Sequence, residues 1–196
     1  MTLGEIRALL LRLRYWGRLE IGGKFRIDGG TINPNRGKIR IGRKAEIKRG
    51  AIIDANDGFV IIGDHFSLNP YSILYGSGGL TIGNWVRIAA HVVVIPANHG
   101  FSDPDTPIKK QPETRQGIVI EDDVWIGAGA VVLDGAHISR GCVIGAGSVV
   151  RGRTDPLGIY AGVPARKVGV RGEKRLIADA RGTPRNPTLP LSRNKD

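Results

Sequence analysis

The stretch that decides the fold runs from Ile120 to Val150 and reads IEDDVWIGAGAVVLDGAHISRGCVIGAGSVV. An aliphatic residue recurs at every sixth position, and a small residue stands two positions before each later one. The aliphatic positions are Ile120, Ile126, Val132, Ile138, Ile144 and Val150, and the small ones are Val124, Ala130, Ala136, Cys142 and Ser148. A fixed internal period indicates a repeat architecture, in which each unit buries the open face of its neighbour.

The same period recurs upstream in triplets of aliphatic residues. These are Ile41, Ile47 and Ile53; Ile62, Leu68 and Leu74; Ile82, Ile88 and Val94; and a weaker set of Ile21 and Ile27 with Asn33 in third place. The step from Ile120 to Ile138 is three hexapeptides without surplus. Each step between successive upstream triplets is slightly longer. The upstream turns therefore carry two or three extra residues at a corner.

A longer gap separates Ile82 from Ile120. It exceeds one basic turn by a long insertion, which we expect to form a loop over residues 98–117. A long insertion in a repeat usually leaves the scaffold as a loop on the binding face.

The period predicts an all-β solenoid with three short strands per turn, whose aliphatic residues point into a triangular prism. Glycine after several of these aliphatic residues suits tight corners. An antiparallel β-sandwich would instead require period-two alternation and hairpin turns. It does not explain a six-residue phase held over residues 120–150.

Composition places the chain among globular proteins, with 196 residues, 41% hydrophobic and 24% charged. The net charge of +11 is spread along the sequence, without a zinc finger, aromatic RNA-binding motif or helix-turn-helix pattern, so we expect no nucleic-acid partner. Polyanionic coenzyme A or a lipid-linked or nucleotide-linked sugar would suit this charge. The one cysteine, Cys142, allows no intramolecular disulfide and is expected to serve in packing.

The predicted organisation is a capping helix in residues 1–20, a β-helix over 21–168 and a basic tail over 169–196. Residues 3–18 place Leu3, Ile6, Leu10 and Leu13 near one helical stripe. This helix either covers the first coil or lies on an anionic membrane surface. A short helix is expected near Glu173 to Ala180. No apolar run approaches a membrane span, and no convincing signal peptide is present.

Three segments together resemble the hexapeptide-repeat acyltransferase superfamily. They are residues 118–130 around Trp125, the Gly145-Ala146-Gly147 turn, and Tyr160 to Lys167. The resemblance covers roughly residues 21–168 and is to sugar and antibiotic O-acetyltransferases, in particular those acting on surface polysaccharides. It implies a left-handed parallel β-helix, acetyl-CoA as acyl donor, no required metal, and a homotrimer with active sites between subunits.

The resemblance also implies roles for individual residues. His99, in the sequence PANHG where the loop begins, matches the base that deprotonates the acceptor hydroxyl. Imidazole suits this role because it titrates near neutral pH. Contacts with coenzyme A are implied for Trp125, Ala128, Ala146, Arg151, Arg166 and Lys167.

Acceptor contacts are less well defined by the sequence. The family often carries an asparagine on an early coil, and the matching stretch here is Asn69-Pro70-Tyr71. Asp103 and Glu113 on the loop are candidates for orienting the base or the sugar. The other histidines are expected to be structural or exposed.

The sequence thus predicts an O-acetyltransferase of surface-polysaccharide sugars in the cytoplasm, or at the inner face of the membrane with peripheral association. A streptogramin- or chloramphenicol-type antibiotic acetyltransferase is the alternative. Two other classes use this fold: a non-catalytic scaffold, which would not bind acetyl-CoA, and a gamma-type carbonic anhydrase. The latter would need His65, His91 and His99 on a shared zinc ion, and their spacing differs from that enzyme's.

Overall fold

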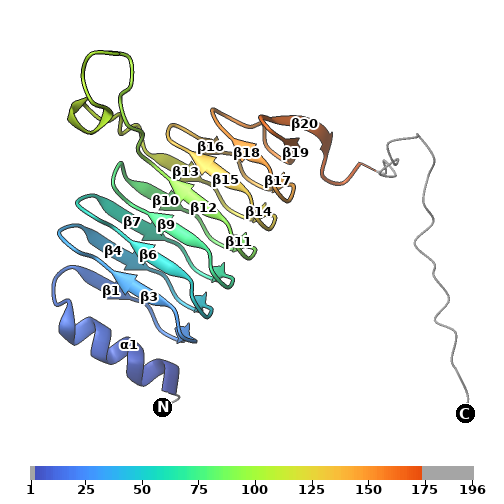
Figure 1. Cartoon of the computed structure of the whole chain (residues 1–196). Helices are drawn as coiled ribbons and strands as arrows, with labels where there is room; N and C mark the ends of the chain where they lie inside the picture. Colours follow the sequence, from blue (N-terminus) through green and yellow to red (C-terminus); the bar gives the residue numbers. More distant parts are fainter. Residues whose placement is uncertain (1–2, 174–196) are drawn as a thin grey trace, which may run out of the picture.

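The computed structural model describes residues 3–173, and it stacks short strands into a three-sided prism (Figure 1). Consecutive strands lie in three different sheets, here called A, B and C, so three strands complete one coil. Six coils follow one another, from β1–β3 (coil 1) to β16–β18 (coil 6). The architecture is a left-handed parallel β-helix, as predicted.

Each sheet collects one strand from every coil. Sheet A contains β1 (Leu19–Ile21), β4 (Lys38–Ile41), β7 (Phe59–Ile62), β10 (Leu80–Ile82), β13 (Ile118–Ile120) and β16 (His137–Ile138). Sheet B contains β2 (Arg26–Ile27), β5 (Glu46–Ile47), β8 (Ser67–Leu68), β11 (Arg87–Ile88), β14 (Trp125–Ile126), β17 (Val143–Ile144), β19 (Gly158–Gly162) and β20 (Ala165–Val170). Sheet C contains β3 (Thr31–Asn33), β6 (Ile52–Asp54), β9 (Ile73–Tyr75), β12 (Val93–Ile95), β15 (Val131–Leu133) and β18 (Val149–Val150).

The strand register confirms the six-residue phase. Ile82 pairs with Ile120 and Val94 with Val132, so the long insertion leaves the stacking of the coils unchanged. The periodic aliphatic residues are buried in one continuous core, and Cys142 is fully buried in it. Burying these stacked side chains is the main stabilising contribution, because the short strands have little local stability of their own.

The first coil departs from the predicted phase. Ile32, not Asn33, points into the prism and pairs with Ile53, while Asn33 faces outward beside Asp54. The turn before β3 is one residue shorter than in coil 2. Gly30 lies inside this turn, where an added Cβ would come within 2.6 Å of the Ile47 Cγ2. The missing residue shifts the inward position from 33 to 32.

The three corners of the prism differ in width. At the corner between sheets A and B, coils 1–5 turn at a residue with positive φ, between 57° and 61°: Lys24, Lys44, His65, Trp85 and Asp123. The extra residues of the upstream coils enter instead between sheets C and A. This C–A corner carries residues 34–37, 55–58 and 76–79 in the first three coils and the long loop in the fourth.

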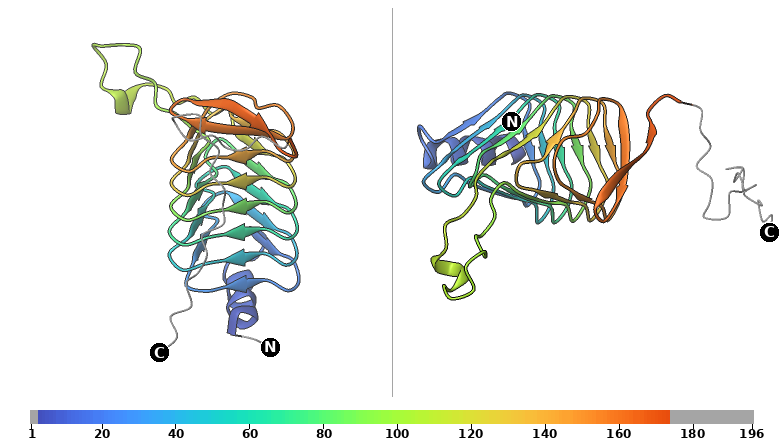
Figure 2. Two further views of the ribbon diagram at one scale, coloured as in Figure 1. Left: turned by 90° about the vertical axis from the view of Figure 1, so that its right-hand side faces the viewer. Right: turned by 90° about the horizontal axis from the view of Figure 1, so that it is seen from above.

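Both ends of the prism carry additional elements (Figures 1 and 2). Helix α1 (Leu3–Arg14) lies at the N-terminal end and stops four residues before the predicted end. Leu11 and Tyr15 pack against the core, whereas Ile6, Leu10 and Leu13 of the predicted apolar stripe are exposed. At the other end, β19 and β20 form an antiparallel pair. The helix expected near residues 173–180 and the tail beyond 173 lie outside the described residues.

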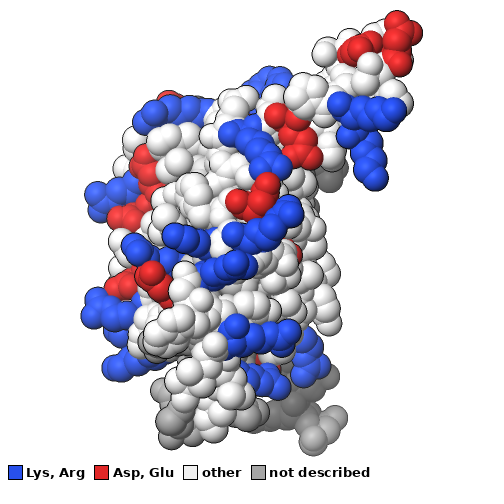
Figure 3. Space-filling model, turned by 90° about the vertical axis from the view of Figure 1, so that its left-hand side faces the viewer, with Lys and Arg blue, Asp and Glu red and all other residues white. Residues whose placement is uncertain are grey.

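The surface charge is distributed over many coils. On the face drawn in Figure 3, lysine and arginine side chains lie among acidic ones from the N-terminal end to the loop. Several are paired across neighbouring coils, such as Arg40 with Glu20 and Arg43 with Asp64, each at 2.8 Å. Exposed pairs of this kind contribute little to stability, about 0–1 kcal/mol each. Among the described residues, no helix is long and apolar enough to cross a bilayer.

Candidate active site

The loop between β12 and β13 projects from the C–A corner (Figure 2). Its base is fixed by a two-way backbone pairing, in which Asn98 N–H donates to Thr114 O at 2.9 Å and Thr114 N–H donates to Asn98 O at 2.8 Å. Near the tip, the Gln111 amide donates to the carbonyl oxygens of Asp103 and Thr106 at 2.8 and 2.7 Å. A short 3-10 helix, η1 (Ile108–Lys110), lies between Thr106 and Gln111 in the sequence. The residues flanking the base of the loop are therefore held in place.

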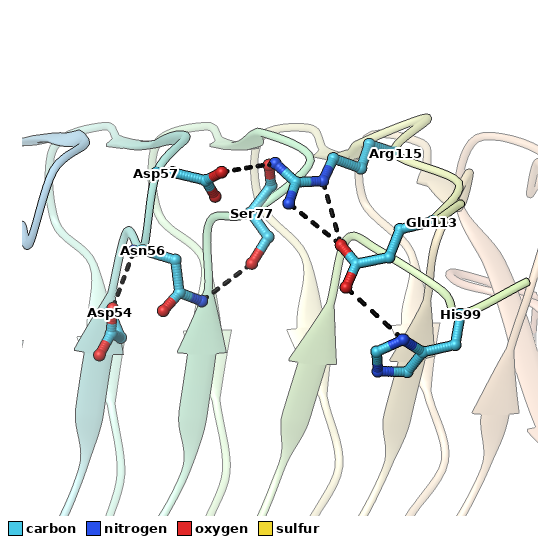
Figure 4. Close-up of polar contacts among 7 residues, drawn as sticks. All are labelled: Asp54, Asn56, Asp57, Ser77, His99, Glu113 and Arg115. Carbon is cyan, nitrogen blue, oxygen red and sulfur yellow. Dashed lines mark hydrogen bonds and ion pairs between the residues drawn. The ribbon is translucent and has the colours of Figure 1, made fainter. Parts of the chain in front are cut away.

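His99 follows this backbone pairing and faces a carboxylate from the returning strand of the loop. Its Nδ1 lies 3.5 Å from Glu113 Oε1 (Figure 4). The imidazole side chain is 65% exposed, and that of Glu113 35% exposed. Because Nδ1 faces the carboxylate, Nε2 is the nitrogen that can meet a ligand. A carboxylate beside the far nitrogen can orient the imidazole toward a ligand at Nε2.

Arg115 links this pair to the second coil. Its guanidinium donates to Glu113 Oε2 at 3.0 and 3.2 Å and to Asp57 Oδ2 at 2.8 Å. The Asp57 hydrogen bond, followed by that to Glu113, raises the pKa of Arg115 above its ordinary value, and the same guanidinium lowers the pKa of Asp57. These ion pairs connect the loop, which carries Glu113 and Arg115, with the turn that carries Asp57 two coils away.

A polar groove of about 670 Å³ runs along the C–A corner beside these residues. Its lining comes from the widened turns of coils 1–3, from the loop, and from the end of the N-terminal segment: Asn33, Asn35, Arg36, Asn56, Asp57, Ser77, Glu113, Arg115 and Tyr15. Asn35 donates to Asp54 Oδ1 at 2.6 Å, and Asn56 donates to Ser77 Oγ at 2.8 Å. Figure 4 shows polar side chains from Asp54 to His99 in a row along the corner.

The residues expected to bind coenzyme A lie elsewhere on the chain. Trp125 is 54% exposed on the outer face of sheet B, and Ala128 and Ala146 are exposed in turns between sheets B and C. Sheet B is the side of the prism opposite the C–A corner. A single chain therefore does not bring these residues to His99.

The basic residues implied for the phosphates occupy the C-terminal end of the helix. Arg151 directly follows β18, and Arg166 and Lys167 are exposed on β20. Lys167 Nζ lies 2.9 Å from Asp155 Oδ2, which raises the pKa of the lysine. Arg151 lies at the C–A corner two coils beyond the loop, whereas Arg166 and Lys167 lie on sheet B, away from that corner.

Of the four acceptor candidates, only Glu113 contacts His99. Asn69 donates its side-chain N–H to Ile88 O at 2.7 Å, and Tyr71 stacks on His91 at the corner between sheets B and C, with ring centroids 5.5 Å apart. Asp103 accepts hydrogen bonds from its own loop, chiefly from Thr106, and these lower its pKa. The structure thus groups Glu113 with the base and leaves the other three apart.

The remaining histidines are distributed over different corners. His65 stacks on Trp85 between sheets A and B, with ring centroids 3.7 Å apart, and His137 Nε2 contacts Glu121. His65, His91 and His99 therefore occupy three different corners of one prism. Within residues 3–173, no three His, Cys, Asp or Glu side chains gather as a metal site.

Most of the groove was not predicted from the sequence. Asn35, Asn56, Asp57, Ser77 and Arg115 were not singled out, although all five line it. The available signal was the length of the upstream coils, which exceeds three hexapeptides, because the surplus residues are the polar ones at this corner.

Comparison with known proteins identifies the family. Residues 117–152 match the family model of the bacterial transferase hexapeptide, a set of six repeats. The putative lipopolysaccharide biosynthesis O-acetyl transferase WbbJ of Escherichia coli is 34% identical over 140 residues, which cover 67% of this chain and 71% of WbbJ. The chain belongs to the hexapeptide-repeat acyltransferases.

Two further proteins are similar to this chain. It is 33% identical over 168 residues to the probable acetyltransferase Rv3034c of Mycobacterium tuberculosis, covering 80% of this chain but 56% of that protein's length. A variant of AntD, an N-acyltransferase from Bacillus cereus, superposes with a TM-score of 0.72 at 28% identity, covering 84% of this chain and 90% of AntD. AntD was solved there with dTDP-4-amino-4,6-dideoxyglucose and coenzyme A.

Proposed function

We propose that this acyltransferase moves an acetyl group from acetyl-CoA to a sugar hydroxyl during assembly of a surface polysaccharide. The observation that carries the proposal is the His99–Glu113 pair, 3.5 Å apart, at the end of a polar groove. The similarity to the putative lipopolysaccharide O-acetyl transferase supports the choice of acceptor class.

In the proposed reaction, His99 Nε2 accepts the proton of the acceptor hydroxyl. The hydroxyl oxygen then attacks the thioester carbonyl carbon, and the C–S bond breaks as the tetrahedral intermediate collapses. The imidazolium returns its proton to the coenzyme A sulfur, so no net proton is gained or lost. Glu113 stabilises the transient imidazolium, and a base of this kind typically contributes about 10²–10⁴-fold to the rate.

We further propose a homotrimer in which the acetyl-CoA site is completed by a second subunit. Two observations support this assembly. The implied donor residues Trp125, Ala128 and Ala146 lie across the prism from His99. The outer face of sheet C also carries a column of aliphatic side chains with partial exposure. That column is Ile52, Ile73, Val93, Val131 and Val149, paired strand to strand. An aliphatic column of this kind suits contact with a second copy.

We also propose that the protein works in the cytoplasm and associates peripherally with the membrane through α1. The exposed fractions of Leu10, Leu13 and Trp16 are 59%, 59% and 84%. Arg7 and Arg14 lie on α1 with Leu10 and Leu13 and are exposed, and Trp16 follows the helix by two residues. Apolar side chains together with arginines suit the interface of an anionic bilayer.

The test of the proposed function is a thioester-consumption assay with acetyl-CoA and three acceptor panels: hydroxyl sugars and their oligomers, dTDP-linked amino sugars, and antibiotics. Free thiol release that requires a hydroxyl sugar, with an O-acetyl product by mass spectrometry, is the expected result. His99→Ala should reduce kcat by at least about a hundredfold. Its control is His65→Ala, at another corner. Turnover only with another panel, or equal activity of H99A, would overturn the assignment.

A second candidate function is transfer to the amino group of a dTDP-linked sugar. It is favoured by the similarity to AntD, which was solved with such a sugar. A neutral amine is a stronger nucleophile than a hydroxyl and needs less help from a base. The amino-sugar panel separates the two functions: an amide product retained in H99A would support the second candidate.

A further inference from the structure

The groove along the C–A corner extends well beyond the reach of the His99–Glu113 pair. Its polar residues come from the turns after three successive coils and from the loop after the fourth: Asn35 follows β3, Asn56 follows β6, Ser77 follows β9, and Glu113, beside His99, lies in the loop after β12. Adjacent strands of a sheet lie about 4.8 Å apart, so three coil steps separate Asn35 from His99 by roughly 14 Å. This length exceeds what a single pyranose ring can span.

The chemistry of the lining suits a ligand rich in hydroxyl groups. Asn35, Asn56 and Ser77 present amide and hydroxyl groups that donate and accept hydrogen bonds. Each asparagine uses a side-chain N–H on its neighbour, Asn35 on Asp54 at 2.6 Å and Asn56 on Ser77 at 2.8 Å. These contacts hold the amides in place, and each amide keeps capacity for a ligand. Rigid groups of this kind lose little entropy on binding.

The charges of the lining are balanced rather than positive. Its two cationic residues are Arg36 and Arg115, and its two anionic residues are Asp57 and Glu113. Arg115 is engaged by both carboxylates, at 2.8 and 3.0 Å. A diphosphate would compete with these carboxylates for the guanidinium. The groove is therefore suited to sugar hydroxyls and poorly suited to a nucleotide diphosphate.

The groove has a direction. One end lies at Glu113, beside His99, and the other reaches Tyr15, which follows helix α1. Tyr15 is partly buried against the core, so its aromatic ring is held at that end. Aromatic faces commonly pack against apolar surfaces. A chain lying in the groove would thus extend from the reacting hydroxyl toward the N-terminal helix.

We infer that the acceptor is an oligosaccharide of several sugar residues, which lies in the C–A groove with its reacting hydroxyl at His99 and its next sugars along Ser77, Asn56 and Asn35. This inference rests on the proposed transfer to a sugar hydroxyl and specifies its substrate class. Asn35 and Asn56 are positioning residues, since the coil steps place them beyond the sugar that reacts.

The test compares acceptors of increasing length. Methyl glycosides of glucose, galactose, mannose, rhamnose and N-acetylglucosamine are assayed with acetyl-CoA beside the corresponding disaccharides and trisaccharides. For the series that is acetylated, kcat/KM should rise at least tenfold from monosaccharide to trisaccharide. In Asn35→Ala and Asn56→Ala, the ratio of kcat/KM for the trisaccharide to kcat/KM for the monosaccharide should fall severalfold, mainly because KM for the trisaccharide rises.

Asn84→Ala is the control for removal of an asparagine away from the groove, because Asn84 lies in a tight turn at the A–B corner and its side chain accepts the Asp64 N–H at 2.8 Å. The control should keep the wild-type ratio. A readout independent of turnover is saturation-transfer NMR of trisaccharide with H99A and with the double variant H99A/N56A. Signals should extend over several sugar rings in the first and weaken in the second.

The outcomes separate the two proposals. If no sugar in any series is acetylated, the proposed function itself fails. If sugars are acetylated but kcat/KM is independent of length, or if N35A and N56A behave like N84A, the oligosaccharide inference is overturned while the proposed function stands. A preference for nucleotide-linked monosaccharides over free trisaccharides would also overturn it.

Discussion

Replacing Glu113 by glutamine tests the role of the carboxylate beside His99. Glutamine keeps the size of the side chain and its capacity to accept a hydrogen bond but removes the charge. Nδ1 and Oε1 are 3.5 Å apart, and the two side chains are 65% and 35% exposed, so water screens them strongly. At the dielectric constant of water, two unit charges at this separation interact by about 1.2 kcal/mol.

This interaction is present only when the imidazole carries the transferred proton. Its loss should therefore raise the barrier and lower kcat about eightfold, since about 1.4 kcal/mol corresponds to a factor of ten. Loss of a fully buried carboxylate in the same role can lower kcat by as much as about 10⁴-fold. The eightfold loss expected here is smaller because this pair is exposed to water.

The assay is steady-state release of the coenzyme A thiol at saturating acetyl-CoA. Arg115→Gln serves as the control, because it breaks the ion pairs to Asp57 and Glu113 but leaves the Glu113 charge in place. We expect R115Q to affect KM for the acceptor more than kcat. An E113Q enzyme with unchanged kcat would refute the role assigned to Glu113.

Three further predictions concern stability. Leu74→Ala, at a fully buried position, should lower the free energy of unfolding by about 2–5 kcal/mol in urea titration, and an effect below about 1 kcal/mol would argue against the tight core. Gly58→Ala should cost about 1–3 kcal/mol in the same titration, because its Cβ would come 2.1 Å from Gly76 O; a neutral effect would contradict this packing. The His137 hydrogen bond, then the Arg140 N–H, lowers the pKa of Glu121, so its contribution is complete above the ordinary glutamate pKa and is lost as pH falls through the lowered value. Tm measured against pH should therefore fall less steeply in acid for Glu121→Gln than for wild type, and parallel curves would exclude the effect.

The fold was largely predictable because its core repeats in sequence. Each inward aliphatic residue is six positions from the next, and the register of Ile82 with Ile120 shows that a long insertion does not disturb the phase. The prediction failed at Asn33, where the loss of one residue moved the inward position to Ile32. It also extended α1 to residue 18, whereas the helix ends at Arg14.

The candidate site was predictable only where it interrupts the repeat. His99 stands where the phase breaks, and the loop sequence brought Glu113 into consideration. The contact between Arg115 and Asp57 joins residues 58 positions apart, and no local pattern connects them. Their proximity arises from the stacking of coils, which places turns from distant parts of the chain side by side. The acetyl-CoA site implied by the resemblance is likewise not connected to His99 by any local pattern, because Trp125 and His99 lie on opposite sides of the prism.

The confinement of surplus residues to the C–A corner has an evolutionary consequence. Sheets A, B and C keep their pairing whether this corner holds four residues or the whole loop, because the strands on either side are stacked by the core. Changes of length at this edge therefore leave the strand pairing intact, and its outward-facing polar residues can change freely, whereas close-packed positions such as Gly58 cannot. A family built on such a scaffold can diversify its substrates by exchanging one row of turns, and the same row is the place to graft new specificity in the laboratory.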